Sequence, residues 1–531
     1  MSIPGSANSL LLASAAAEGG YQIERSLRFN SADSAYLSRT PANSGNRKTW
    51  TWAGWVKRSK LGIGAYLFMA VQNSSNYSEL YFATDDKLRI VNYVGGAIVS
   101  RRITTAVYRD ASAWMHVAVS SNSSTSLKVY VNGAEVTVFD VSTGPTTNDW
   151  FFNATVAHGV GADGAGTYYF YDGYLADIHF IDGQALDPTS FGEFDATTGV
   201  WVPKAYTGTY GTNGFHLEFA DNSSNTATTL GKDTSGNGNN WTPNNLSVTA
   251  GAGNDSLVDV PTNGAETDTG AGGEVRGNYC TWNPLDSGLS VNPTNGNLDC
   301  AGANSDKSIR GTIGYPTSGK WYCEYSNTAA EVGIGAQNTT LTSTPSSGNH
   351  VFYLNTGLKR VDGAASGYGA SFTTTDVVGV AFDADAMQVT FYKNNVSQGS
   401  LSVTRGFTYF PIVKFFDNTI AANFGQRPFA YTAPSGFKAL NTANLPAGTI
   451  TTSGSFTGNA NTDGPFVWLN GVPTAMTING NAVTFGTHAD RLANGFKVRS
   501  SSGSYNTAGS NTYSITTTGA KFKDARAQPN P

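Results

Sequence analysis

The chain has 531 residues, a formal net charge of −5 at pH 7 and only 13% charged side chains. A protein of this length has room for roughly three domains, and its negative balance argues against a nucleic-acid partner, which would need a basic surface. No segment approaches the ~20 apolar residues of a membrane-spanning helix, so the composition, with 61 glycines and much Ser, Thr and Asn, favours an extracellular or virion β-protein.

Residues 1–20 form an Ala-rich arm in front of a β-rich body. The apolar run Leu10–Leu12 and the small residues Ala15–Ala17 look like the middle and end of a secretory signal. A signal peptide, however, needs a basic region before its apolar core, and no Lys or Arg precedes Arg25. We therefore expect a weakly apolar arm that orders when it binds in a groove on a neighbouring protein.

Alternation of apolar and polar residues recurs after residue 20 and predicts an all-β chain built of tandem β-sandwiches. In LKVYVNGAEVTVF, which starts at Leu127, the alternation leads into Asn132–Gly133, a dipeptide that favours the type I′ turn of a two-residue hairpin. The same device recurs at Asn394–Asn395 and at Asn479–Gly480. Nothing indicates alternating strands and helices or a coiled coil.

Two changes of composition divide the body of the chain. The Gly-, Thr- and Asp-rich stretch from Gly251 has few apolar residues and is typical of a linker, and a second break follows around Leu445–Gly448. We expect an arm at 1–20, a first sandwich at 21–250, a linker at 251–277, a second sandwich at 278–446, and a small C-terminal β domain with its tail at 447–531.

The first sandwich shows an ordered series of strand motifs. A Trp-rich strand, KTWTWAGWVKR, puts Trp50 and Trp52 on one face and Trp55 on the other, and WMHVAVSS, YVNG and DGYLADI follow in that order. The series resembles the laminin-G-like (concanavalin A-like) jelly roll. This resemblance implies an adhesive module that binds glycans or proteins through loops at a sandwich rim, often beside calcium.

Some relatives with this sandwich are glycosidases, in which a short strand carries E-x-D-x-x-E and its two glutamates act as nucleophile and acid/base. The nearest match here starts at Glu193 and includes Asp195, but Thr198 stands where the second glutamate would be. The carboxylate pair cannot form locally, so we interpret these residues as polar positions after a strand and expect no enzyme activity.

Four oxygen-bearing side chains stand at alternate positions in one loop, with glycine at its sixth position. They suit a hard cation such as calcium, and they are Asp233, Ser235, Asn237 and Asn239. The twelfth position is Asn244 rather than a bidentate glutamate, and Asn-Gly tracts are also ordinary turn formers. Calcium binding and a plain turn both remain open, and no other cofactor is expected.

The second sandwich carries GKWYCEY, EVGIG, DVVGVAFDADAMQVTFYKNN and NFG in this order. These segments resemble a SPRY domain, although Asn394–Asn395 stands where that family usually has Asn-Gly. Asparagine also tolerates the left-handed conformation that the turn requires. The resemblance implies a β-sandwich that acts as an interaction module without catalysis.

The search for catalytic groups gives little. Asp383 and Asp385 form a D-x-D that could be a carboxylate dyad, but they stand where a strand ends, which favours a turn. No G-x-S-x-G, H-E-x-x-H, C-x-x-C or Walker motif occurs. The six histidines stand apart in the sequence, and we interpret His116 and His179 as packed or edge residues rather than ligands.

The three cysteines all fall in one region of the chain: Cys280, Cys300 and Cys323. A secreted disulfide scaffold normally has more cysteines, and an even number of them. We therefore expect buried free thiols rather than a bridge.

Taken as a whole, the chain resembles predicted structural or tail-fibre proteins of tailed phages of marine bacteria. The resemblance involves the arm, the laminin-G-like sandwich, the DSLVDVPTN segment at 255–263, the SPRY-like sandwich and the C-terminal tail. It implies a protein assembled on the exterior of the phage particle.

Two non-enzymatic functions fit this resemblance. The first is host attachment, with sandwiches that bind a host cell-surface glycan or protein and gain avidity from several copies. The second is capsid or tail decoration, as in a head fibre, without receptor binding. A polysaccharide depolymerase is a third, and it would need carboxylates from distant parts of the chain. We expect a homo-oligomer that contacts other virion structural proteins through its arm, with no nucleic acid and no membrane insertion.

Overall fold

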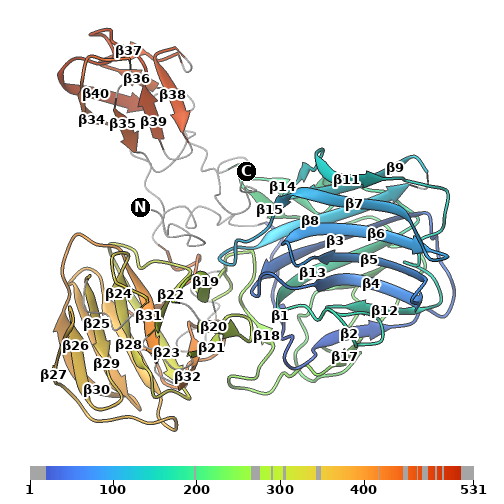
Figure 1. Ribbon diagram of the computed structural model, residues 1–531, viewed down its shortest axis with the longest axis horizontal. Coiled ribbons are helices and arrows are strands. Elements are labelled where there is room, and N and C mark those ends of the chain that lie inside the picture. Colours follow the sequence, from blue (N-terminus) through green and yellow to red (C-terminus); the bar gives the residue numbers. More distant parts are fainter. Residues whose placement is uncertain are drawn as a thin grey trace.

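The computed structural model describes residues 20–515, apart from 123, 196–198, 265–274, 289–290, 303–306, 343–347, 416–417, 446–452, 463–464, 469–475, 485–486 and 493–494. The described chain contains β-strands and one short 3-10 turn, η1 (Pro188–Ser190), and no α-helix. Figure 1 shows the strands gathered into sandwiches. The predicted all-β fold class, with tandem sandwiches and a small C-terminal β unit, is therefore confirmed.

The first sandwich consists of two eight-stranded sheets. Sheet A has the order β10 (Ala134–Glu135), β9 (Ser126–Val131), β8 (Met115–Asn122), β3 (Thr49–Arg58), β13 (Gly173–Asp182), β1 (Ser26–Phe29) and β18 (Ser256–Leu257), with β16 (Phe215–Leu217) paired to β13. Sheet B has the order β11 (Phe139–Thr143), β7 (Ala97–Val107), β6 (Lys87–Val94), β5 (Asn76–Phe82), β4 (Ala65–Asn73), β12 (Ala157–Val160), β2 (Tyr36–Arg39) and β17 (Thr242–Asn244). A two-stranded ribbon is formed by β14 (Gly192–Phe194) and β15 (Trp201–Pro203).

The Trp-rich strand β3 shows why both faces of sheet A are apolar. Trp50 and Trp52 are fully buried in the core between sheets A and B, where Trp50 meets Trp150 edge-on at 5.1 Å between ring centroids. Trp55 points to the opposite face and belongs to a different core. The predicted alternation is confirmed, and the second face is buried because another layer covers it.

The second sandwich also has two sheets. One has the order β19 (Trp282–Ser287), β22 (Lys307–Gly311), β31 (Tyr409–Phe415), β24 (Glu331–Ala336), β25 (His350–Tyr353), β26 (Leu358–Val361) and β27 (Ala364–Gly367). The other has the order β20 (Val291–Thr294), β21 (Asp299–Gly302), β32 (Asn418–Asn423), β23 (Lys320–Ser326), β28 (Val378–Asp383), β29 (Gln388–Lys393) and β30 (Val396–Ser402), with β33 (Lys438–Ala439) paired to β23.

A small third unit follows near the C-terminus. Its four-stranded sheet contains β34 (Ser453–Gly458), β40 (Gly509–Ile515), β36 (Met476–Ile478) and β37 (Asn481–Ala482), and its three-stranded sheet contains β35 (Phe466–Trp468), β39 (Gly495–Val498) and β38 (Ala489–Leu492). Ile478, Phe496 and Val498 are fully buried and form a core of its own.

The hairpin turns have the backbone conformation that their sequences predict. The φ angles are +48° and +76° at Asn132–Gly133, +45° and +66° at Asn394–Asn395, and +49° and +79° at Asn479–Gly480. Two successive positive φ values define the type I′ turn, whose twist matches that of the flanking strands. All three hairpins are confirmed.

The predicted linker differs from expectation in its first part. Within 251–277, Ser256–Leu257 forms β18 and pairs with β1 of sheet A, so the first sandwich extends past residue 250. Leu257 and Val260 are fully buried and join the core of the second sandwich. The stretch is short of apolar residues on average, but the few that it has are placed where two sandwiches meet.

The outer face of sheet A packs against the second sandwich. Trp55, Trp114 and Tyr174 of the first sandwich share one hydrophobic core with Trp282 and Cys300 of the second. The hydroxyl of Tyr174 also donates a hydrogen bond of 2.7 Å to the carbonyl oxygen of Gly296. The two sandwiches are therefore joined by apolar burial as well as by the covalent chain.

A buried ion pair lies in this interface. The ammonium of Lys57, on β3, is 2.7 Å from a carboxylate oxygen of Asp259, and both side chains are at most 1% exposed. Lys57 also donates to the Asn278 side chain at 2.8 Å and to the Tyr279 carbonyl at 3.0 Å. The other Asp259 oxygen accepts the indole N–H of Trp114 at 3.0 Å. All of the ammonium's donors thus have partners, as a buried charge requires.

The three cysteines are buried and free, which confirms the sequence prediction. Burial raises the pKa of the Cys280 thiol to about 11 and that of Cys323 to about 12. These thiols are protonated at neutral pH and serve as small apolar core residues.

Other predictions fall at the ends of the chain or concern membranes. The predicted arm at 1–20 lies outside the described residues except for Gly20, and so does the tail after residue 515. Among the described residues, no helix has the length and apolar character needed to cross a bilayer.

We predict that Lys57→Met destabilises the two sandwiches together. The substitution leaves the Asp259 carboxylate buried without its cation, which costs about 3–5 kcal/mol in free energy of unfolding. Urea unfolding of the full chain, followed by tryptophan fluorescence, measures the loss. The double variant Lys57→Met/Asp259→Asn should recover part of it, because the amide is neutral and its oxygen still accepts from Trp114.

Lys128→Met is the matched control, because Lys128 forms an exposed pair with Glu135 that contributes little. Equal losses of unfolding free energy in Lys57→Met and Lys128→Met would contradict the proposed contribution of the buried pair to stability.

We also predict that the first sandwich loses stability in mild acid because His158 is buried in its neutral form. Burial lowers the pKa of His158 to about 4, and its Nε2 accepts the Asn153 N–H at 3.2 Å. As the pH falls from the unfolded-state pKa of ~6.5, the unfolded chain gains a proton that the fold excludes. The stabilisation is complete above that value and is lost toward the folded pKa of about 4.

Urea unfolding from pH 7 down to pH 4 should therefore show a falling free energy of unfolding. One such histidine contributes a slope of up to about 1.4 kcal/mol per pH unit. His158→Gln should reduce the slope by about this amount, and an unchanged slope would show that this histidine is not responsible.

Candidate functional site

A row of tyrosines lies on the outer face of sheet B. In β5, Leu80 and Phe82 point into the core between the sheets, so Tyr77, Glu79 and Tyr81 point outward. This is the ordinary alternation of a half-buried strand, with aromatic rings on the side away from the core.

The strand register brings further tyrosines beside these. Tyr77 pairs with Tyr93 of β6, and their rings stack at 4.8 Å between centroids with an interplanar angle of 20°. Tyr81 pairs with Tyr66 of β4 at 5.6 Å, and Tyr169, which is 50% exposed, lies 5.3 Å from Tyr66. We call these five residues the tyrosine face.

A carboxyl group lies between the rings. Glu79 is 7% exposed, and the Tyr66 hydroxyl donates to it at 3.0 Å. Burial raises the pKa of Glu79 to about 7, against the opposing effects of the Tyr66 hydrogen bond and the charge of Arg89. Arg89 is directly opposite Tyr81 in the register, so a guanidinium borders the same face.

This combination suits a sugar. The weakly polarised C–H face of a pyranose packs on an aromatic ring, while tyrosine hydroxyls, a carboxyl and a guanidinium supply the directed hydrogen bonds that its hydroxyls require. Ligand sites commonly combine such apolar surface with a few convergent polar groups. The tyrosine face thus combines aromatic surface with a few polar groups, as carbohydrate sites do.

A second group of chemically active side chains lies on the outer face of sheet A. His179 of β13 pairs in register with His216 of β16. Asp177 has a φ of +50°, at a point where the pairing of β13 with β3 shifts by one residue. Such a β-bulge redirects a side chain, and here it turns the carboxylate toward both imidazoles. We call these three residues the Asp–His cluster.

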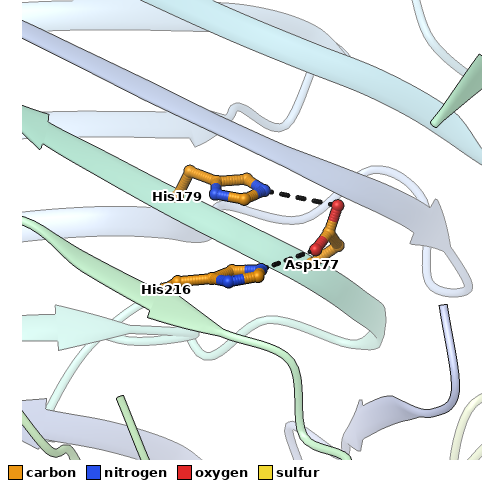
Figure 2. Close-up of side chains that lie close together, drawn as sticks. All are labelled: Asp177, His179 and His216. Atoms are coloured by element: carbon orange, nitrogen blue, oxygen red, sulfur yellow. Dashed lines mark hydrogen bonds and ion pairs between the residues drawn. The ribbon is translucent and has the colours of Figure 1, made fainter. Parts of the chain in front are cut away.

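Figure 2 shows the two imidazoles one above the other with the carboxylate at their side. Their rings stack at 4.1 Å between centroids, with an interplanar angle of 15°. The Nε2 atom of His216 is 2.7 Å from Asp177 Oδ1, and that of His179 is 3.3 Å from Asp177 Oδ2. The two histidines stand apart in the sequence, but the pairing of β13 with β16 makes them neighbours in the fold.

Burial and neighbouring charges shift the pKa values of these three side chains in opposite directions. Burial alone would raise the pKa of Asp177, but the two histidines hold it well below its usual value. Burial and the neighbouring His216 lower the pKa of His179, whereas Asp177 raises the pKa of His216 against the effect of burial. Asp177 is therefore ionised at neutral pH, and His179 is neutral.

The Asp–His cluster borders the surface. A hollow of about 360 Å³ is lined by residues that include Tyr21, Tyr210, His216, Glu218 and Thr234. His216 reaches it with 9% of its side chain exposed. One residue of the cluster, His216, therefore borders this hollow.

The calcium candidates lie in a loop that closes on itself. The Asp233 carboxylate accepts the backbone N–H groups of His216, Ser235 and Asn239 and the Ser235 hydroxyl, at 2.7–2.9 Å. The amide of Asn237 donates to the Gly211 carbonyl at 2.6 Å, and that of Asn239 donates to neighbouring carbonyls. A cation would have to displace hydrogen bonds to Asp233, and calcium binding at this loop stays a prediction.

Two other carboxylate motifs are not brought together into sites. Glu193 is exposed on β14, beside Lys204 at 3.9 Å, and Thr198 lies outside the described residues. The strand β28 ends at Asp383, which accepts the Ala386 N–H, and Asp385 accepts the Gly319 N–H. The interpretation of Asp383 and Asp385 as turn residues is confirmed.

Residues 30–190 match the family described as the concanavalin A-like lectin/glucanases superfamily. The match covers the larger part of the first sandwich and not the whole chain. It confirms the concanavalin A-like part of the domain prediction. The first sandwich is therefore similar to the domains that this family model describes.

Several solved structures are similar to parts of the chain. The SPRY domain of human HERC1 is 16% identical, covering 27% of this chain and 96% of that one, with a TM-score of 0.23. A heptameric SAP-like pentraxin from Limulus polyphemus is 16% identical, covering 32% and 80%, with a TM-score of 0.25. Domain 4 of the arabinanase AbnA from Geobacillus stearothermophilus, solved with arabinotriose, is 18% identical, covering 28% and 66%, with a TM-score of 0.23. No curated protein matches the sequence.

Neither the tyrosine face nor the Asp–His cluster was predicted from the sequence. The tyrosine face could have been noticed as alternate aromatic residues in NYSELYF, which starts at Asn76, and in the next strand at Tyr93. The Asp–His cluster has a weaker signal, the D-x-H of Asp177 and His179, because His216 follows 37 positions after His179 and is joined to it only by strand pairing.

We predict that Tyr66→Phe raises the pKa of Glu79 above its value of about 7. The hydroxyl of Tyr66 stabilises the ionised carboxylate, so its removal favours the protonated form. The carbon-13 NMR signal of the Glu79 carboxyl, followed with pH, measures the midpoint. Tyr93→Phe is the control and should leave it in place. A midpoint that falls in Tyr66→Phe would contradict the assigned hydrogen bond.

Proposed function

We propose that the protein mediates host attachment on the exterior of a phage particle, and that the tyrosine face is its glycan-binding surface. The observation that carries the binding function is the group of tyrosines around Glu79, in which Tyr77 stacks on Tyr93 and Tyr66 meets Tyr81 edge-on. This tyrosine face lies on the concanavalin A-like sandwich, outside its core and away from the interface with the second sandwich. The virion setting rests on the resemblance of the whole chain to phage structural proteins.

Attachment through this surface benefits from several copies. Single carbohydrate sites made of stacking and exposed hydrogen bonds are weak, and linked copies convert weak sites into strong avidity. A homo-oligomer, anchored to other virion proteins through residues 1–20, would present several tyrosine faces at once. The second sandwich and the third unit serve in this proposal as spacer and interaction modules.

The strand register disfavours depolymerase activity at the tyrosine face. A retaining glycosidase needs two carboxyl groups ~5.5 Å apart. The residues directly opposite Glu79 on its two neighbouring strands are Met69 and Val91. Because both cross-strand neighbours are apolar, Glu79 acts in this proposal as a hydrogen-bonding group and not as half of a catalytic pair. Decoration without receptor binding is the remaining alternative.

The test is binding of the purified full chain to an array of bacterial capsular polysaccharides and lipopolysaccharides. We expect saturable binding to a subset of them, without new reducing ends. Tyr77→Ala/Tyr93→Ala should weaken this binding about tenfold or more, because each lost stacking partner contributes ~0.5–1.5 kcal/mol beyond its area. Tyr392→Ala, on β29 of the second sandwich, is the matched control and should bind as the unmodified chain does.

Each alternative has a distinct result. The absence of binding to every polysaccharide would contradict the attachment proposal and favour decoration. New reducing ends would favour a depolymerase. Binding that Tyr392→Ala weakens as much as the double variant does would remove the tyrosine face from the proposal.

A further inference from the structure

The Asp–His cluster contains a buried nitrogen whose polar contact is poorly aligned. The side chain of His179 is 2% exposed, and its Nε2 lies 3.3 Å from Asp177 Oδ2 without the geometry of a good hydrogen bond. A buried polar atom left in this state is costly in a stable fold. Its environment therefore calls for an explanation beyond ordinary packing.

The neighbouring donor atoms supply one. A carboxylate oxygen of Asp177 and a ring nitrogen each from His179 and His216 lie within 4.8 Å of one another, and all three residues are buried. We propose that these three side chains bind a divalent transition-metal ion of the zinc, cobalt and nickel class. The proposal is independent of glycan binding, which takes place on the other sheet.

The far nitrogens of both rings support this assignment. His179 Nδ1 lies 2.9 Å from the hydroxyl of Tyr210, and His216 Nδ1 lies 3.0 Å from the hydroxyl of Thr234. Metal-binding histidines characteristically donate their second ring N–H to an oxygen, which fixes the tautomer and aims the other nitrogen at the ion. Each imidazole of the cluster has such an oxygen on the side away from Asp177.

The donor set decides the type of ion. Two imidazoles and one carboxylate suit zinc and its neighbours, whereas calcium and magnesium prefer oxygen alone. Donor atoms in a tetrahedral zinc site lie ~3.3 Å apart, and these three lie within 4.8 Å of one another. Because the two rings now stack nearly parallel, both must rotate before their nitrogens converge on an ion, and the ion replaces the present hydrogen bond between His216 Nε2 and Asp177 Oδ1.

Three protein ligands leave a coordination position open, and the structure indicates where it faces. Asp177 borders a second small hollow, of about 80 Å³, that is lined also by Tyr21 and Glu218. His216 borders the larger hollow described above. An ion at the cluster would be reached from these hollows, and a water molecule would fill its fourth position.

The test uses cobalt(II) and zinc chloride with the purified full chain, after treatment with a chelator. Cobalt should give the visible absorption bands of a tetrahedral nitrogen–oxygen site, with one ion bound per chain, and an excess of zinc should remove them. Zinc should also raise the melting temperature of the first sandwich, because it binds the folded state alone. His216→Ala should abolish both effects.

Two further variants keep the result interpretable where His216→Ala is poorly folded. Tyr210→Phe leaves all three ligands in place and removes the oxygen partner of His179, so it should weaken zinc about tenfold. His488→Ala, in the third unit, is the matched control and should bind cobalt unchanged. Absence of the cobalt bands in the unmodified chain, or equal losses in His488→Ala and His216→Ala, would overturn the proposal.

Discussion

The arrangement of the two large sandwiches depends on the burial of the ion pair between Lys57 and Asp259. Two charges taken out of water are tolerable only when they meet each other and further polar partners, and here the partners come from both sandwiches and from the segment between them. The pair is therefore fully stabilised only when the two sandwiches are correctly assembled. If one sandwich moved against the other, Lys57 or Asp259 would lose its partner while it remained buried among apolar residues. One relative orientation of the sandwiches is therefore strongly preferred.

Because of this fixed orientation, the two sheets of the first sandwich have different roles. The outer face of sheet A is used for assembly, since Trp55, Trp114 and Tyr174 pack there against the second sandwich. The outer face of sheet B is left to present the tyrosine face. The Asp–His cluster lies on sheet A, on the paired strands β13 and β16. The proposed glycan-binding and ion-binding residues thus lie on opposite sides of one domain and do not overlap.

The predictable features of this protein were those encoded within single strands and turns. Asn132–Gly133 specifies its hairpin because two positive φ values are needed at once, and the faces of Trp50 and Trp55 follow from strand alternation. The prediction of a linker failed at Leu257 because this residue pairs with β1, which is far away in the sequence. Average composition does not reveal such pairing. The Asp–His cluster was hidden for a similar reason. It requires a bulge at Asp177 and a strand pairing that spans 37 residues, and neither has a local signature.

The first described residues have a mechanical consequence. The Tyr21 hydroxyl donates to Asp177, and the backbone of Ile23 exchanges two hydrogen bonds with the Thr262 side chain, just before β1 enters sheet A. Tension applied to the chain ahead of Tyr21 would therefore be shared between β13 and the segment that joins the sandwiches. Because β1 lies between β13 and β18, the pull would load its ladder in shear, with several hydrogen bonds resisting together.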